Sequence, residues 1–511
     1  MRARKAIWLL PTVAIISTSI GAAQVAAAVP PNDPQAEAQR STSAPGPTFK
    51  SRTDLVLVPV VVRDSKGRHI RGLSKEAFGL KEKGKPQEIT LFEEVQPDSS
   101  LSPSVPDRGY GNVAYDNARR PGLTVIVLDL LNMKPLEQTE AKEQIANFLE
   151  KDLAEGQPVS LMKITSDGLK LIQPTTADRG QLLHALKKMP IWTGLVMWRA
   201  NHVDPVIQGL RDIGDAYAGI PGRKSLILVG GYLSELQLDP RETPMYSWSL
   251  QRMGQSLMNA SISVYPLEIT SWAPQSMIDP PTGWSTWPRD AFLHSFAGET
   301  GGNICYGAQW NGCLADAVED SRSYYMLGVH VRSDDRKRGW RDLKVSVAVE
   351  HADVRARSGF YYGPPPASDA KTAREEEINA LGSAAPKSDV PMYVKVLGME
   401  ALVSGAKDKK TVSFMINLPL GSVRMDSSKA NPLDLEVGAI AITDKKTKEA
   451  GELLHAVRGS PKPENLQAWT TYGIEIPEKL DLSPGVYDMR FFVRDMNSGK
   501  IGTVVFPLSV E

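Results

Sequence analysis

The sequence predicts an α/β protein: a Rossmann-like, doubly wound domain that is inserted in a small β domain and followed by an immunoglobulin-like all-β sandwich. Three observations lead to this prediction. Between residues 121 and 321, short apolar runs of strand length alternate with segments of helical periodicity, as in parallel α/β sheets. Strand patterns without helices flank this region on both sides. From 391 to 511, only strand patterns and turn signals remain.

The N-terminal residues 1–28 have the features of an export signal. Arg2, Arg4 and Lys5 precede an apolar run from 7 to 20, and small residues follow it. A membrane anchor is the alternative, although the run is short and contains Pro11. We therefore expect an exported protein, periplasmic or secreted, with no membrane span after signal removal. Residues 29–50 are rich in Pro, Ala, Ser and Gln, which predicts a disordered linker.

The segment 51–96 is too short to bury a core of its own. Its strand patterns are expected to pair with those of 322–363, which places the α/β domain inside a small β domain. The segment 97–121, which connects 51–96 to the α/β region, is expected to be a loop or linker. The expected strands are 55–62, 89–92, 324–331, 343–349 and 354–361.

The α/β region 121–321 opens on a wholly apolar strand pattern that ends at Asp129. Strands buried on both faces read as such continuous runs. The further expected strands are 225–229 and 262–269, with a hairpin over 159–164 and 169–173. Helical periodicity is expected over 137–153, 178–189, 203–217, 291–297 and 314–318.

Residues 364–390 predict a linker with a short helix, because they begin with a run of prolines and contain a charged, helix-forming stretch near 371–381. Residues 391–511 predict a β-sandwich of the immunoglobulin type without its cysteine pair. Its expected strands are 392–399, 411–418, 433–442, 471–476, 486–494 and 501–509.

Several short motifs follow one another along 55–363, each present once. They are VPVVVRDSKG at 58–67, GLSKEAF at 72–78, GKPQ at 84–87, GRKSLIL at 222–228, VYPL at 264–267, TGG at 300–302 and YYMLG at 324–328. In this order and spacing, the chain resembles the von Willebrand factor A (VWA)-related proteins of the acidobacterial type. The resemblance implies an A-type domain, a sheet covered by helices on both faces that is used for adhesion or protein–protein contact.

Many A-type domains hold a divalent ion through Asp-x-Ser-x-Ser, a distant Thr and a distant Asp. On this chain the resemblance carries over to Asp129 and Thr193, whereas Leu131 and Met133 replace both serines, and Gly230 and Gly231 stand where the distant Asp is expected. Mg²⁺ and Ca²⁺ require several hard oxygen ligands. We therefore expect a degenerate site without metal, and no other cofactor. As an alternative role, Asp129 caps backbone amides of the next loop.

Tryptophan is concentrated in the α/β region, where seven of the ten lie between 192 and 310. Six fall in expected loops at the edge where Asp129 emerges, and tryptophan is enriched in binding hot spots. We hypothesise that these residues bind the ligand. The alternative is a self-packed loop whose rings cover the sheet edge. The six residues are Trp192, Trp198, Trp272, Trp284, Trp287 and Trp310.

The two cysteines, Cys305 and Cys313, can pair as a disulfide in an exported protein or remain as two buried thiols. The balance of 59 basic and 59 acidic residues argues against a nucleic-acid partner, which requires a basic field. Metalloprotease, nucleophile-elbow and phosphate-loop motifs are absent from the sequence.

The sequence therefore predicts a non-enzymatic, exported binding protein. Its expected partner is another protein, with an extracellular polysaccharide as a second possibility. A structural component of the cell envelope, or an enzyme with an unrecognised active site, are the alternatives.

Overall fold

The computed structural model describes residues 53–97, 109–112, 122–193, 203–230, 243–269, 291–305, 310–332, 339–362, 385–401, 409–443, 448–461 and 463–511. The predicted export signal and the linker that follows it lie outside these residues. Among the helices described, none is both long and apolar enough to cross a membrane.

The α/β domain is built on a five-stranded sheet with the order β10-β9-β6-β7-β8. Its first four strands are parallel: β10 (Ile262–Glu268), β9 (Lys224–Gly230), β6 (Leu123–Asp129) and β7 (Val159–Thr165). The edge strand β8 (Gly168–Thr176) pairs antiparallel with β7. Every residue of β6 and β9 is buried, because helices cover both faces of the sheet.

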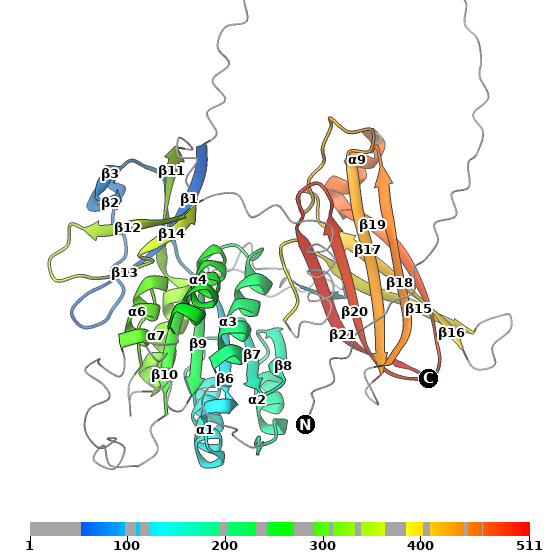
Figure 1. Ribbon diagram of the computed structural model, residues 1–511, viewed down its shortest axis with the longest axis horizontal. Helices are drawn as coiled ribbons and strands as arrows, with labels where there is room; N and C mark the ends of the chain where they lie inside the picture. Colours follow the sequence, from blue (N-terminus) through cyan, green and yellow to red (C-terminus); the bar gives the residue numbers. More distant parts are fainter. Residues whose placement is uncertain are drawn as a thin grey trace, which may run out of the picture. The chain divides into compact units, whose positions relative to one another are not determined.

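Two apolar cores lie on opposite faces of this sheet, whose strands and helices are labelled in Figure 1. On one face, side chains of β6 such as Ile126 and Leu128 pack with α1 (Pro135–Lys151), α2 (Arg179–Lys188) and α7 (Trp310–Arg322). On the other face, Val125 and Val127 pack with α3 (Val203–Tyr217), α4 (Thr243–Asn259) and α6 (Ala291–Thr300). The structure is thus mixed α/β, as the alternating pattern predicts.

A β unit is formed from the segments on either side of the α/β domain. Its first sheet has the order β13-β1-β11-β4 and its second β14-β12-β2-β3. A shared apolar core joins strands of the two sheets through Val58, Phe78, Leu80, Leu327 and Phe360. The strands are β1 (Thr53–Arg63), β2 (Phe78–Glu82), β3 (Lys85–Gln87), β4 (Ile89–Val95), β11 (Tyr324–Arg332), β12 (Gly339–Val347), β13 (Asp353–Ala356) and β14 (Gly359–Tyr362), with the short helix η1 (Lys75–Ala77) before β2.

One expected strand of this unit is divided in two. The sequence predicts a single strand over 354–361, but the chain changes sheets at 357–358, so that β13 pairs with β1 and β14 pairs with β12. The hydrogen bonds of Arg357 mark this change of direction, because its Nη1 donates to Met258 O and its Nη2 to Leu57 O. A hydrophobicity pattern shows which residues are buried, not which sheet they join.

A buried ionic cluster fastens the β unit to helix α7. Asp320 is fully buried, and its Oδ1 accepts hydrogen bonds from Arg63 Nε at 3.0 Å and Arg63 Nη2 at 2.5 Å. Its Oδ2 accepts from Tyr265 Oη at 2.6 Å and from Arg355 Nη1 at 3.2 Å. Burial raises the pKa of Asp320, but a hydrogen bond from His69 and the charges of the surrounding arginines hold it far below its usual value.

The C-terminal part consists of two four-stranded antiparallel sheets with the orders β19-β16-β15-β5 and β18-β17-β20-β21. Side chains from both sheets form one core, in which the Phe414 and Phe491 rings lie 5.0 Å apart. The strands are β5 (Tyr110–Gly111), β15 (Tyr393–Ala401), β16 (Lys410–Leu418), β17 (Leu433–Thr443), β18 (Lys448–Gly459), β19 (Ile474–Leu482), β20 (Gly485–Asp495) and β21 (Ile501–Val510).

Three features of this part differ from the prediction. Strand β18 and the helix α9 (Pro463–Tyr472) were not expected. Strand β5 comes from the segment expected to be a loop or linker, and it pairs with β15. Nearby, Asn112 Nδ2 donates to Lys387 O and Val390 O. A two-residue strand carries no periodicity, so its partner cannot be found from the sequence.

The end of the predicted linker 364–390 is also packed rather than free. Ala385 and Val390 are fully buried, and Ser388 Oγ donates to Ala216 O and accepts from Gly219 N. A Cβ on Gly219 would overlap the backbone of Ser388, so this close approach requires glycine. The predicted short helix near 371–381 lies outside the described residues.

Candidate functional site

The carboxyl ends of the parallel strands form the predicted site. The register of β6, β9 and β10 aligns Asp129 with Gly230 and Gly230 with Glu268. On the other side, Asp129 is aligned with Ile164 of β7. In open α/β sheets, ligands bind at this edge, beside loops that the strands hold in place.

Asp129 ends strand β6 and caps the short helix η2 (Leu130–Asn132) that follows it. The residue is fully buried. Its Oδ1 accepts a hydrogen bond from Leu131 N at 3.1 Å, and its Oδ2 accepts one from Asn132 Nδ2 at 2.6 Å. Both carboxylate oxygens are thus engaged by the next three residues of the chain. This is the capping role expected for Asp129 as the alternative to metal binding.

Burial raises the pKa of Asp129 to about 6, while the hydrogen bonds from Asn132 and Leu131 act in the opposite direction. Desolvation disfavours the charged form of a carboxyl group, and no cationic side chain contributes to this shift. At neutral pH the group therefore carries its charge at an energetic cost.

The residues at the two serine positions of the metal motif belong to the cores. Leu131 is 4% exposed and packs in the core with α3 and α4, whereas Met133 is 3% exposed and packs in the core with α1 and α7. Neither side chain offers an oxygen. Across the described residues, no three His, Cys, Asp or Glu side chains lie close enough together to hold a metal ion. Positions 131 and 133 therefore supply no ligand for a divalent cation.

A buried glutamine joins the Asp129 loop to the segment after α2. Gln138 is fully buried, and its Nε2 donates to Met133 O and to Trp192 O, each at 3.1 Å. Its Oε1 accepts from Trp192 N at 2.8 Å. Trp192 is thereby held beside the loop that Asp129 caps, and the exposed Thr193 follows it. A polar residue on the apolar face of a predicted helix was the sequence signal for this contact, and it was missed.

The two described tryptophans of the predicted set contribute to packing. Trp192 is partly buried and contacts both cores. Trp310 is 8% exposed, begins α7 and packs in the core with α1. In the described structure Trp310 therefore serves the core, as in the self-packed alternative, and its contact with a ligand stays a prediction. Trp198, Trp272, Trp284 and Trp287 lie outside the described residues.

Cys305 and Cys313 form a disulfide, with their Cα atoms 5.8 Å apart. Cys305 N donates to Pro266 O at 2.9 Å, and Cys305 also bridges to Leu267 of β10. Cys313 lies in the first turns of α7. The cross-link therefore ties this helix to the segment beside the edge strand of the sheet, near Trp310.

Comparisons with known proteins give remote structural likenesses. No family model matches the chain, and no curated protein matches it. Proximal thread matrix protein 1 from the mussel byssus is 10% identical, with a TM-score of 0.27, over 39% of this chain and 48% of that protein, about half its length. The N-terminal domain of TFIIH p34 is 13% identical, with a TM-score of 0.23, over 40% of this chain and 99% of that one. The VWA domain of SpRpn10 is 13% identical, with a TM-score of 0.24, over 38% of this chain and 94% of that one.

Proposed function

We propose that this chain is an exported, non-enzymatic binding protein with a VWA-type domain, and that the domain captures a protein partner without a metal ion. The observation that carries the metal-independent part is the environment of Asp129. Its two oxygens are satisfied within its own loop, and the neighbouring serine positions hold core side chains. An edge arranged in this way recognises a partner through loop surfaces rather than through a shared cation.

The export part of the proposal rests on the sequence of residues 1–28, with its basic start, apolar run and small residues. The disulfide between Cys305 and Cys313 is consistent with it, because disulfides persist in oxidising compartments. The protein-binding part rests on the strand order and on the long, tryptophan-rich segments between the strands.

The experiment is affinity capture with the mature chain as bait and an envelope extract of the cells that make it. Parallel columns contain excess Mg²⁺ or excess EDTA, and the bound proteins are identified by mass spectrometry. We expect one specific partner in equal yield on both columns. Capture that EDTA abolishes would contradict a metal-independent edge, and capture of polysaccharide alone would contradict a protein partner.

A matched set of variants locates the binding surface. Trp284→Ala with Trp287→Ala tests the tryptophan hypothesis, and Leu136→Ser, at a position that is 74% exposed on α1, is the control. Loss of capture with an unchanged melting temperature would support ligand contact by the tryptophans. Unfolding of the tryptophan variant would instead support the self-packed loop.

A further inference from the structure

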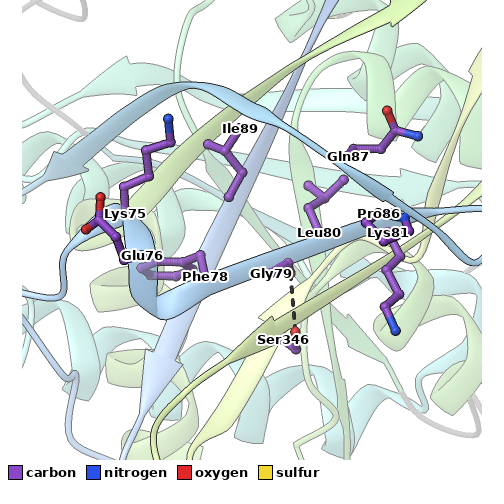
Figure 2. A pocket seen from close by; sticks show the side chains of 10 residues that line it. All are labelled: Lys75, Glu76, Phe78, Gly79, Leu80, Lys81, Pro86, Gln87, Ile89 and Ser346. Carbon is purple, nitrogen blue, oxygen red and sulfur yellow. Dashed lines mark hydrogen bonds between the residues drawn. The ribbon is translucent and has the colours of Figure 1, made fainter.

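The β unit contains a groove that is separate from the sheet edge of the α/β domain. It has a volume of about 300 Å³, at the lower end of the range for ligand pockets. Phe78, Leu80 and Ile89 form its apolar part, and Lys75 and Lys81 lie at its opposite ends (Figure 2). Pro86 and Gln87 of β3 form one wall.

The groove exists because strand β3 is short. All five residues of β2 pair with β12, but only Leu80, Lys81 and Glu82 pair with β3. The chain leaves the sheet after Gln87 and enters β4 in the other sheet. Within the described strands, no strand therefore lies beside Phe78 and Gly79 where β3 would continue, although the Phe78 N–H donates to Lys75 O in the preceding turn. Exposed sheet edges of this kind accept an extended segment from a partner.

A glycine deepens the hollow. Gly79 presents no side chain on the exposed face of β2, and a Cβ at this position would lie 2.7 Å from Ser346 Oγ. Ser346 Oγ itself is turned toward Gly79 O, at 3.4 Å (Figure 2). Small side chains on both strands leave room for another chain to lie across the sheet at this point.

The surface around the groove carries an excess of positive charge. Lys75 and Lys81 are exposed, and the exposed Lys344 lies opposite Lys81 in the register of β2 and β12. Glu76 is the single acidic residue in the lining. A hydrogen bond from Ser74 and the charge of Lys75 lower the pKa of Glu76, so this carboxylate already has local partners. The groove therefore complements negative charge.

We propose that this groove binds an extended, acidic segment of a partner protein. The carboxylates of the segment pair with Lys75 and Lys81, its backbone follows the line of β3 past Gly79, and an apolar side chain covers Phe78 and Ile89. This site does not depend on the sheet edge of the α/β domain or on the proposal made for that edge. A pair of lysines at the two ends of an apolar floor selects a segment in which acidic and apolar residues alternate.

Fluorescence anisotropy on the full chain tests this proposal. The probe is a short fluorescein-labelled peptide of alternating glutamate and leucine, and the same peptide with lysine in place of glutamate is the negative probe. We expect saturable binding of the acidic peptide only. The double variant Lys75→Glu with Lys81→Glu should weaken it by about tenfold or more, because two attractions become repulsions. Lys75→Gln with Lys81→Gln should give an intermediate loss.

Lys66→Glu is the matched control, because Lys66 is an exposed lysine in a turn of the same β unit and lies outside the lining. This variant should bind like the wild type, and all variants should keep the wild-type melting temperature. Binding should also weaken as the ionic strength rises. Absence of saturable binding, or an equal loss in Lys66→Glu, would overturn the proposal. Saturable binding of fluorescein-labelled polygalacturonate, with no binding of the peptide, would point to an acidic polysaccharide and would likewise overturn it.

Discussion

Restoring the two serines of the metal motif should unfold the α/β domain rather than create a metal site. The double variant Leu131→Ser with Met133→Ser removes two side chains that are 4% and 3% exposed. Truncating a buried Leu or Met costs about 2–5 kcal/mol. The two residues pack in the cores on opposite faces of the sheet, so each truncation leaves a cavity of its own.

The expected total is therefore about 6 kcal/mol of unfolding free energy, taking a value near 3 kcal/mol for each residue. This is a large share of the 5–15 kcal/mol by which domains are usually stable. Urea unfolding followed by far-UV circular dichroism measures the loss. Leu136→Ser is the matched control, because Leu136 is 74% exposed and surface substitutions usually change stability by about 0.5 kcal/mol or less.

The same titrations in excess Mg²⁺ complete the experiment. We expect no recovery with the ion, because Leu131 N and Asn132 Nδ2 already occupy the oxygens of Asp129. The reasoning would be refuted if the double variant unfolded within about 1 kcal/mol of the wild type and gained stability from Mg²⁺. That result would mean that positions 131 and 133 face an open edge with room for a cation.

Three further predictions follow from the buried charges and the disulfide. Since burial raises the pKa of Asp129 to about 6, its contribution to stability is fully present below about pH 4 and is lost as the pH rises through about 6. The Asp129→Asn variant cannot ionise at this position, so its urea midpoint at pH 7 should equal or exceed that of the wild type. The lowered pKa of Asp320 has the opposite effect: its contribution to stability is present above about pH 4 and is lost in acid. Asp320→Asn removes the charged acceptor of Arg63, so it should cost about 3–5 kcal/mol of unfolding free energy at pH 7 and flatten the acid side of the curve of urea midpoint against pH. An unchanged midpoint would contradict the structural role of the cluster. Replacing Cys305 and Cys313 by serine should cost about 2–3 kcal/mol and make the melting temperature insensitive to reductant; a wild-type melt that reductant does not change would contradict the bond.

The sequence predicted those parts of the fold in which the apolar pattern has a single interpretation. The run from Leu123 to Asp129 is buried at every position, and its length and composition identify a central strand. The alternating helices and strands around it predicted the mixed α/β class. Helix α9 and strand β18 were missed: β18 is an edge strand with mixed polar and apolar residues, and a pattern of this kind does not alternate clearly. Which sheet a strand joins depends on long-range pairing, which the divided segment at β13 and β14 illustrates.

The candidate site was predicted less completely than the fold. The sequence placed Asp129 at the sheet edge and recognised that Leu131 and Met133 offer no oxygen. It did not reveal that Gln138 holds Trp192 beside this loop: a polar residue on the apolar face of the predicted helix marked the position, but the sequence does not show which backbone groups it binds. The packing of Trp310 in the core could not be read from the sequence either, because a large aromatic residue at the start of a helix suits a binding surface and a core equally well.

The most direct test of the central claim, that the carboxylate ending β6 serves its own loop, is isothermal titration calorimetry of Mg²⁺ and Mn²⁺ into the full chain. Asp129→Asn is the reference in the same titration. The account predicts indistinguishable heats of dilution for the two proteins with both ions. Saturable binding to the wild type that disappears in the variant would contradict it.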